Sequence, residues 1–240
     1  MATIQDNINR IKQAKADIKE AIIAKGGTLA EDAKLSEFKE AVEGLPSGGA
    51  SFEEIMTDDN GRGVVGIKQV IVNEGVTILT ASAYKGMQIV KIQLPYSLNI
   101  INSGCFENCT LLNEVIIRDN VTKIGPYAFK GLSKLTKLNL PKKLQEIGMQ
   151  AFMSAGFTEG LHLPQGVTKI PIGCFYNCSK LPSLIFDEHT AIPTLDNINA
   201  FQSTPCKFIV PDALYDEWVS ATNWSTYADR IIKASEYTES

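Results

Sequence analysis

The chain has 240 residues, a formal net charge of −4, 44% hydrophobic residues and 21% charged residues. This composition is typical of a soluble globular protein, and the acidic balance argues against nucleic acid as a partner because phosphate binding needs a basic surface. No apolar run reaches the roughly 18 residues of a membrane span, and residues 1–20 lack the apolar core of a signal peptide, so we expect neither membrane insertion nor export by the standard route.

Residues 3–24 are predicted to form an amphipathic helix. One side of this helix carries five isoleucines and one lysine at coiled-coil a/d spacing, namely Ile4, Ile8, Ile11, Lys15, Ile18 and Ile22. Isoleucine at both a and d favours three strands over two. The alternative is a helix that packs on the core of its own chain. We favour a homo-trimer with this stripe as its interface, because residues 1–50 hold little else to cover it.

A second short helix is predicted at 36–43, with Ser36 as its N-cap. We assign residues 1–45 to a helical segment for oligomerisation and anchoring. Residues 46–51 are rich in Pro, Gly and Ser, which predicts a flexible linker. Residues 52–66 are expected to form the N-terminal cap of the next domain.

Within this cap, Asp58-Asp59-Asn60-Gly61 offers clustered side-chain oxygens that could bind Ca²⁺. An EF-hand loop needs a glutamate at its twelfth position, where this chain has Gln69. Asn-Gly is a frequent pair in the turn of a β-hairpin. We therefore favour a hairpin turn over a metal site.

A period of 23 residues dominates the middle of the chain. Four apolar series keep this step: Ile92, Val115, Leu138, Leu161 and Leu184; Leu94, Ile117, Leu140, Leu163 and Phe186; Ile101, Ile124, Ile147 and Ile170; Phe106, Phe129, Phe152 and Phe175. Such a unit can bury its apolar face only against its neighbours, so copies in phase indicate a stack along one axis. Residues 67–205 are therefore predicted to form a mainly β solenoid.

Each copy begins with an alternating strand such as 115–117, often closed by a proline, which cannot donate to a sheet. A second apolar pair follows, and an Ala-Phe or Cys-Phe pair then enters the core at a corner. The spacing slips at both ends, where Tyr84 lies 22 residues before Phe106 and Phe201 lies 26 residues after Phe175. Irregular terminal copies are expected of a capped solenoid.

Residues 206–240 are predicted to cap the C-terminal end of the stack. A last strand is expected at 208–210, followed by a short helix at about 212–221. Both tryptophans of the chain, Trp218 and Trp224, fall in this segment. Bulky apolar side chains suit a lid over the last repeat, whose core face would otherwise meet water.

Four of the five cysteines occupy two positions of the repeat. Cys105 and Cys174 share one of these positions, and Cys109 and Cys178 share the other. One interpretation joins Cys105 to Cys109, or Cys174 to Cys178, in a disulfide. The other places them in the core as small reduced side chains. We favour the second, because an oxidised framework usually shows an even count.

No catalytic, cofactor or metal site is predicted. The sequence contains no G-x-S-x-G elbow, no H-E-x-x-H motif, no glycine-rich phosphate loop and no paired-cysteine zinc spacing. The only histidines are His162 and His189, and His162 alternates with two leucines on a predicted strand, so it should point away from the core. We therefore expect a binding protein without enzymatic activity.

The repeat is similar to the BspA-like class of leucine-rich repeats over about 67–205. The residues that carry this similarity include Leu138-Asn139-Leu140-Pro141, Leu144, Ile147-Gly148 and Ala151-Phe152. The copy at 161–181 shows the pattern again, and the ending around Val210-Pro211, Trp224 and Tyr227 looks like the cap common in such proteins from gut bacteria. The resemblance implies a leucine-rich-repeat fold, surface adhesion, and binding of protein or glycan.

The N-terminal segment resembles a different group. Residues 18–26 and 35–38 look like a short helical module of bacteriophage tail-fibre and other virion fibre proteins, over about 1–45. The lack of a signal peptide departs from the pattern of bacterial adhesins. This departure favours the phage interpretation.

We therefore hypothesise a bacteriophage virion fibre or decoration protein. Its N-terminal helices would form a homo-trimer and dock on other virion structural proteins, and its solenoid would bind a host-surface glycan or protein. The alternative is a bacterial BspA-like adhesin that is extracellular or bound to the cell surface. A third hypothesis, a binding module associated with an enzyme, would require a cluster of polar residues in a cleft, which the sequence does not suggest.

Overall fold

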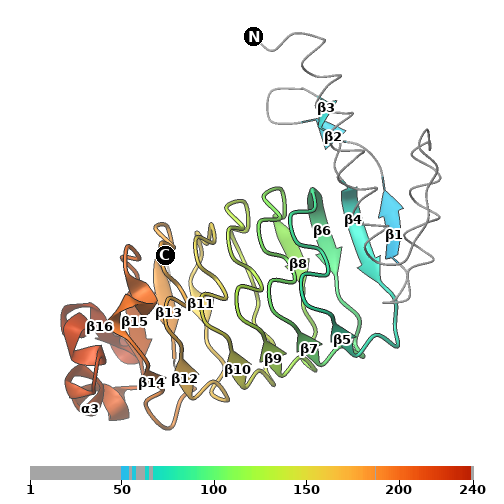
Figure 1. Cartoon of the computed structure of the whole chain (residues 1–240). Helices are drawn as coiled ribbons and strands as arrows, with labels where there is room; N and C mark the ends of the chain where they lie inside the picture. The colour runs from blue at the N-terminus through green and yellow to red at the C-terminus, as the bar shows by residue number, and fades with distance from the viewer. Residues whose placement is uncertain (1–49, 54–55, 58–62, 65–66, 187, 239–240) are drawn as a thin grey trace, which may run out of the picture.

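The computed structural model describes residues 50–53, 56–57, 63–64, 67–186 and 188–238. In these ranges the chain winds into a solenoid of stacked coils (Figure 1). The two helices and the coiled-coil stripe predicted within residues 1–45 lie outside the described residues, and so does the predicted turn at Asn60-Gly61. The short strands β2 (Met56–Thr57) and β3 (Gly63–Val64) pair antiparallel, which is the pairing expected on the two sides of a hairpin turn.

One row of strands follows the first apolar run of each repeat, and we call it the first strand row. Its members are β1 (Ala50–Glu53), β4 (Ile67–Val72), β6 (Ile89–Gln93), β8 (Glu114–Ile116), β11 (Leu161–His162), β13 (Ser183–Ile185), β15 (Lys207–Val210) and β16 (Ile231–Lys233). They form two sheets, with the orders β1-β4-β6-β8 and β11-β13-β15-β16. All neighbours in these sheets run parallel except β1, which pairs antiparallel with β4. Strand β1 begins at Ala50, inside the range predicted as a linker.

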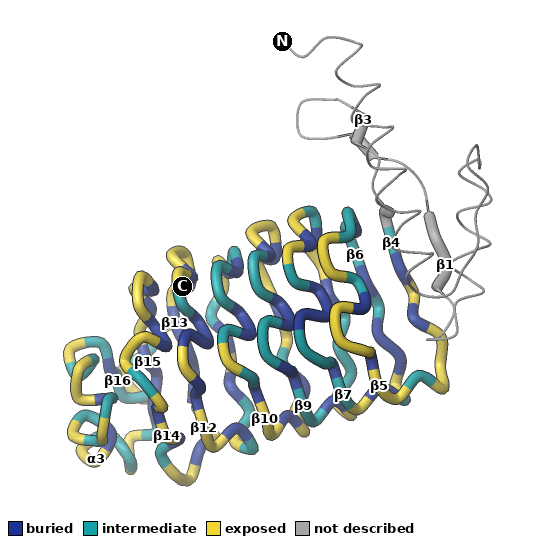
Figure 2. Tube along the Cα trace, viewed as in Figure 1, coloured by how far each residue is buried: buried dark blue, intermediate teal, exposed yellow. Residues whose placement is uncertain are grey.

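A second row of short strands follows the second apolar pair of each repeat. Its members are β5 (Ile78–Leu79), β7 (Ile100–Ile101), β9 (Lys123–Ile124), β10 (Glu146–Ile147), β12 (Lys169–Ile170) and β14 (Thr194–Leu195). The paired strands of this row run parallel, and Figure 1 shows the row along the lower edge of the coils. The buried residues lie between the two rows (Figure 2), so the interior is one continuous apolar core.

Aromatic rings form a stack through this core at the predicted corner. Neighbouring ring centroids lie 5.3 to 5.6 Å apart along the series Tyr84, Phe106, Phe129, Phe152, Phe175 and Phe201. Tyr84 and Phe201, where the spacing slips, join the same stack, so the irregular end copies keep the register of the coils. The prediction that the corner phenylalanines are buried is confirmed, because Phe129 and Phe152 are both 0% exposed.

The backbone turns this corner with two left-handed positions in each of five coils and with one, at Ser203, in the last. The first series is Ser82, Gly104, Tyr127, Gln150 and Gly173, and the second is Gly86, Asn108, Gly131, Ser154, Asn177 and Ser203. Hydrogen bonds between coils run through the same corner: the N–H of Tyr127 donates to the carbonyl of Met149 over 3.0 Å, and the N–H of Phe129 donates to that of Ala151 over 2.8 Å. These bonds satisfy backbone groups that no strand pairs, which buried backbone requires.

Two predicted strands differ from the structure. Residues 138–140 keep inward leucines around an exposed Asn139, but no strand is assigned there, so the first strand row divides into two hydrogen-bonded sheets at this coil. Strand β15 was expected to be the last strand. Instead β16 pairs parallel with β15 after the cap helices, because the chain returns to bury Ile231 against the end of the core.

The C-terminal cap is built from short helices. They are η2 (Asp212–Leu214), α3 (Tyr215–Ser220), η3 (Trp224–Arg230) and η4 (Ala234–Glu236), of which only α3 is an α-helix; the short helix η1 (Ile198–Phe201) precedes the cap and belongs to the last coil. Trp218 and Trp224 are 0% and 1% exposed, and their rings lie 5.0 and 5.7 Å from the ring of Phe186. The predicted tryptophan lid is therefore confirmed.

All five cysteines are buried and free. The thiol of Cys109 donates to the carbonyl of Tyr84 over 2.9 Å, and the thiol of Cys178 donates to that of Phe152 over 3.0 Å. The interpretation as reduced core side chains is confirmed, and the two disulfide pairings are wrong.

Candidate functional site

The outer surface of the first strand row presents one side chain from each coil, between two inward apolar residues. This series runs Gln93, Ile116, Asn139, His162, Ile185 and Ile209. Asn139 and His162 are exposed, which confirms the predicted outward direction of His162. Ile185 and Ile209 are only 3% and 1% exposed although they occupy the same position. The open part of this surface therefore ends at the coil of His162.

The last described residues, up to Thr238, return over the sheet at this point. The hydroxyls of Tyr237 and Ser183 lie 3.0 Å apart, within hydrogen-bond distance. The N–H of Ser235 donates to Oδ1 of Asp212 over 3.0 Å. Hydrogen bonds from the side chain and backbone of Ser235 also hold the pKa of Asp212 below its ordinary value. The ending of the chain is thus attached to the outer surface of the sheet.

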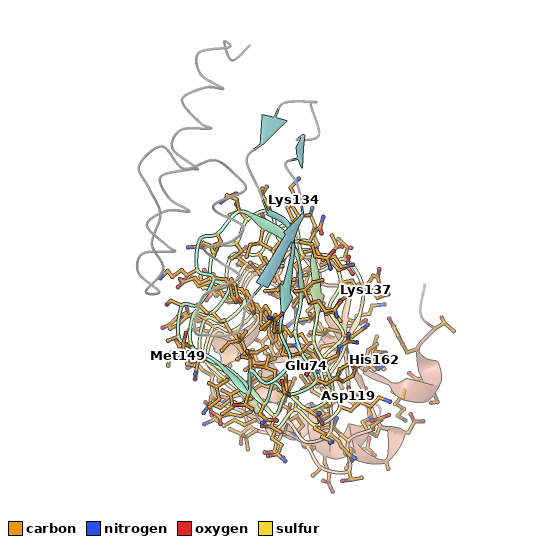
Figure 3. The ribbon with its side chains drawn as sticks, turned by 90° about the vertical axis from the view of Figure 1, so that its right-hand side faces the viewer. Glu74, Asp119, Lys134, Lys137, Met149 and His162 are labelled. Atoms are coloured by element: carbon orange, nitrogen blue, oxygen red, sulfur yellow. The ribbon has the colours of Figure 1, made fainter. Side chains whose placement is uncertain are left out.

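A polar hollow lies between this ending and the central coils, and we call it the sheet-face hollow. It has a volume of about 440 Å³ and is lined by Lys137, Leu138, Asn139, Thr158, Glu159, Gly160, His162, Pro182 and Tyr237. Figure 3 shows Lys137 and His162 on the same side of the solenoid. The ammonium of Lys137 forms an ion pair with the carboxylate of Glu159 over 2.6 Å, with both side chains more than half exposed.

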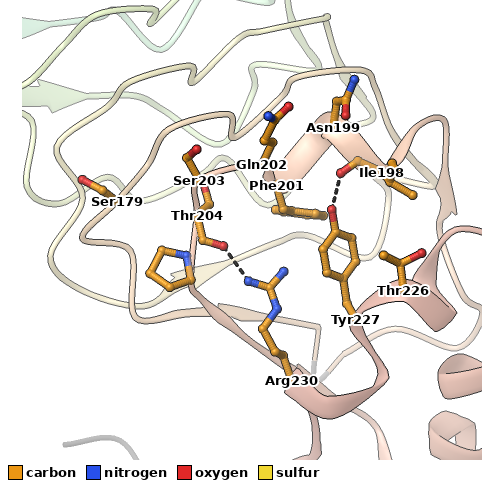
Figure 4. Close-up of a pocket in the computed structure, with 11 residues that line it drawn as sticks. Ser179, Ile198, Asn199, Phe201, Gln202, Ser203, Thr204, Thr226, Tyr227 and Arg230 are labelled. Carbon is orange, nitrogen blue, oxygen red and sulfur yellow. Dashed lines mark hydrogen bonds between the residues drawn. The ribbon is translucent and has the colours of Figure 1, made fainter.

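A second hollow lies between the last coil and the cap, and we call it the cap hollow. It has a volume of about 700 Å³ and is lined by Ser179, Ile198, Asn199, Phe201, Gln202, Ser203, Thr204, Pro205, Thr226, Tyr227 and Arg230. Figure 4 shows the two bonds that hold its walls. Nη1 of Arg230 donates to the carbonyl of Thr204 over 2.6 Å, and the hydroxyl of Tyr227 donates to the carbonyl of Ile198. The guanidinium lies 4.5 Å from the ring centroid of Tyr227, so Arg230 is engaged in fixing the cap.

Apolar side chains also reach solvent at one position beside the second strand row. Met149, Ile172 and Ile198 are 42%, 39% and 44% exposed in three successive coils. Scattered exposed apolar residues are normal on soluble proteins, and larger contiguous patches mark interaction surfaces. This stripe is a secondary candidate for contact with a partner.

The described residues offer no evident centre for catalysis. They contain no group of three or more His, Cys, Asp or Glu that could hold a metal ion. His189 is buried, with its ring 5.2 Å from that of Phe186 in an edge-on contact. None of the helices in the same ranges is long and apolar enough to cross a membrane. The proposed oligomer interface, from Ile4 to Ile22, lies outside the described residues.

The fold defines a class of protein, the leucine-rich-repeat solenoid. Within this class, the family model described as "BspA type Leucine rich repeat region", with six copies, matches residues 62–182 and 100–210. These matches cover more than half of the chain. The chain therefore belongs to the BspA-type leucine-rich-repeat family, as its repeat residues indicated.

Three solved structures resemble the solenoid. A leucine-rich-repeat protein of T. pallidum is 20% identical with a TM-score of 0.50, and 69% of this chain and 91% of that chain are covered. The pneumococcal vaccine antigen PcpA is 14% identical with a TM-score of 0.52, over 70% of this chain and 40% of that chain. A leucine-rich-repeat protein of Bacteroides ovatus ATCC 8483 is 21% identical with a TM-score of 0.45, and 68% of this chain and 58% of that chain are covered. At these identities the likeness concerns the fold alone.

A comparison with curated proteins finds no match.

Proposed function

We propose that the chain is a non-enzymatic attachment protein whose solenoid binds a molecule on a cell surface. The observation that carries this proposal is the outer surface of the first strand row, where a polar hollow lies between the coil of residues 137–139 and the parallel-paired strands β11 and β13. Repeat solenoids provide extended, regularly spaced surfaces that suit recognition, and sites on regular elements are held more firmly than sites on loops. Membership of the BspA-type family supports the same role.

For the carrier of this solenoid we propose a bacteriophage virion fibre or decoration protein. Residues 1–45 would form the homo-trimer through the stripe from Ile4 to Ile22 and dock on other virion structural proteins. The support is the resemblance of residues 18–26 and 35–38 to the helical module of virion fibres. The second candidate is a bacterial adhesin, extracellular or on the cell surface, which the family of the repeats favours.

Attachment is tested with the fluorescently labelled full chain on intact cells of the bacterium in whose genome, or in whose virus, the gene lies. We expect saturable labelling that an excess of the unlabelled chain removes. Labelling that does not saturate, or that the unlabelled chain leaves unchanged, would contradict attachment.

The two carriers are separated by immunogold electron microscopy with an antibody raised against residues 67–238. Gold on particles released at lysis supports the virion fibre. Gold on the envelope of uninfected cells supports the adhesin. Gold confined to the cell interior contradicts both.

A further inference from the structure

We propose that the sheet-face hollow is the receptor subsite, and that it binds one neutral sugar residue of a cell-surface glycan. This inference rests on the attachment function proposed above and names the chemistry of its ligand. It rests on three features of the hollow: a glycine in its lining that allows close approach of the next coil, the balance of charge on its lining, and an aromatic side chain in its wall.

A glycine in the lining lets the next coil approach closely. At the position before the inward apolar residue, successive coils carry Lys137, Gly160, Ser183 and Lys207. A Cβ atom on Gly160 would lie 2.6 Å from Oγ of Ser183 and 3.2 Å from Cδ1 of Ile185, which is closer than ordinary contact allows. The side chains of Ser183 and Ile185 therefore occupy the space beside Gly160, and a larger residue at this position would displace them. The glycine thus allows Ser183 to lie beside the hollow, where its hydroxyl is within hydrogen-bond distance of Tyr237.

The charges of the lining balance one another. The ammonium of Lys137 and the carboxylate of Glu159 are paired over 2.6 Å, so neither sign is in excess to attract an ion. The remaining polar groups include the amide of Asn139 and the hydroxyl of Thr158, each of which both donates and accepts hydrogen bonds. Sugar hydroxyls do the same, so a neutral polyol can form hydrogen bonds with these polar groups. A charged ligand would have to compete with the existing ion pair.

The wall formed by the chain ending supplies the apolar contact that a sugar ring also needs. Tyr237 lines the hollow, and its hydroxyl is within hydrogen-bond distance of Ser183, so its position is fixed from the sheet side. Tyrosine offers an apolar ring with one polar end, which suits a ligand whose faces are C–H groups and whose rim is hydroxyl. The volume of about 440 Å³ lies within the range of roughly 300–1,000 Å³ typical of small-ligand pockets. This size admits one or two sugar residues and excludes a folded partner.

The probe for this proposal is a panel of methyl glycosides at low millimolar concentration: glucose, galactose, mannose, fucose, N-acetylglucosamine, N-acetylgalactosamine and glucuronate. Saturation-transfer NMR with the full chain reports which of them bind. We expect transfer to at least one neutral glycoside and none to glucuronate. Transfer to no glycoside, or to glucuronate alone, would overturn the proposal.

Two variants locate the binding, and both change exposed positions on the outer surface of the sheet. Asn139→Ala removes an amide from the lining, and we expect affinity to fall about tenfold or more, because a site built on hydrogen bonds loses much when one is missing. His162→Trp fills the hollow from a strand position that tolerates aromatic residues, and we expect transfer to disappear. Gln93→Ala is the matched control, since Gln93 has the same outward position two coils earlier and lies outside the lining.

Circular dichroism of each variant verifies the fold. Unchanged transfer in folded Asn139→Ala and His162→Trp would overturn the assignment to this hollow. The same variants in the cell-labelling experiment separate the two proposals. If His162→Trp labels cells as well as the original chain does, the subsite is wrong and attachment stands. If glycosides bind in the hollow and no chain labels cells, the sugar site stands, and attachment and the receptor role of the site are wrong.

Discussion

The corner phenylalanines are the residues on which the stacking of coils depends most directly. Phe129 is 0% exposed and lies between Phe106 and Phe152, at centroid distances of 5.3 and 5.6 Å. Its ring therefore joins three consecutive coils. Removing it leaves a cavity that the neighbouring coils cannot close without losing their backbone hydrogen bonds.

We expect Phe129→Ala to lower the free energy of unfolding by about 3–5 kcal/mol, the usual cost of truncating a buried aromatic residue. Ile172→Ala is the control, because Ile172 is 39% exposed and its truncation should cost less than about 1 kcal/mol. Urea denaturation of both variants measures the difference. Equal losses would show that the stack contributes no more than a surface side chain.

The buried thiols make stability depend on alkaline pH. Burial raises the pKa of Cys109, Cys178 and Cys206 from an ordinary value of 9.0 to about 12. In the unfolded chain these thiols ionise near pH 9, whereas in the folded chain they keep their protons. The folded pKa is the higher one, so the full contribution to stability is present below pH 9 and is lost as pH rises toward 12.

Each of the three thiols should lower the unfolding free energy progressively, and more steeply, as pH rises above 9. Denaturation at pH 7, 9 and 10 measures this slope, and a variant with alanine at the three positions should show a smaller one. Alkylation gives a second readout: the native chain should resist modification at pH 8, and the denatured chain without reductant should gain five groups. A gain of fewer than five alkyl groups by the denatured chain would indicate a disulfide.

At the scale of elements, ion pairs join neighbouring coils, and one carboxylate joins three. Glu107 pairs with Lys85 over 2.8 Å and with Lys130 over 3.5 Å, and its side chain is only 15% exposed. The hydrogen bond from Lys85 is the main cause that lowers the pKa of Glu107. Because the folded pKa is below the ordinary value of 4.5, this contribution is present above pH 4.5 and is lost as pH falls through the folded pKa.

We expect Glu107→Gln to lower the free energy of unfolding at pH 7 by about 1 kcal/mol, and by progressively less as pH falls through the folded pKa of Glu107, where the carboxylate of the original chain gains a proton. Glu146→Gln is the matched control. Glu146 pairs with Lys123, its side chain is 59% exposed, and exposed pairs contribute little. Thermal unfolding of the two variants over a series of pH values from 7 downward provides the comparison. A loss for Glu107→Gln that stays constant over the whole series would mean that charge is not its cause.

Periodicity predicted the inward residues of these elements because an inward position recurs in every coil and leaves its mark in the sequence. It did not predict the left-handed backbone at Tyr127 and Gln150, residues with no preference for that conformation. Hydrogen bonds to the next coil impose it there: the N–H of Gln150, for example, donates to the carbonyl of Ile172 over 3.1 Å.

The sheet-face hollow also escaped prediction. It depends on the close approach of Ser183 to Gly160 and on a contact between Ser183 and Tyr237, which lie 54 residues apart. Neither feature repeats, so neither leaves a periodic signal. The outward direction of His162 was predictable because it follows from strand alternation alone. Sequence thus indicated the surface that carries the candidate site, and the structure was needed to locate the site on it.

At the scale of the whole molecule, the two ends of the solenoid are capped in different ways. The C-terminal end is closed by Trp218 and Trp224 against the ring of Phe186. At the N-terminal end, the described strand β1 pairs antiparallel with β4 and so ends the parallel order of the row. An antiparallel strand at this edge opposes addition of a further coil, which is the role expected of a terminal cap.

The last prediction concerns assembly, and the attachment proposal depends on it most. The stripe Ile4, Ile8, Ile11, Ile18 and Ile22 is apolar, and burying it between chains removes its surface from water at about 25 cal/mol per Å². Isoleucine at a and d favours three chains, although Lys15 weakens that preference. Three solenoids on one stalk would bind three receptor residues together, which converts weak single contacts into strong attachment.

Light scattering should therefore show a trimer for the full chain and a monomer for a chain that begins at Ser51. The variant Ile11→Asp, with a charge in the middle of the stripe, should also be monomeric while keeping the circular dichroism of the solenoid. Its labelling of cells should weaken even though its binding of single methyl glycosides is unchanged, because only the number of linked sites differs. A full chain that is monomeric in solution would contradict trimerisation through this stripe.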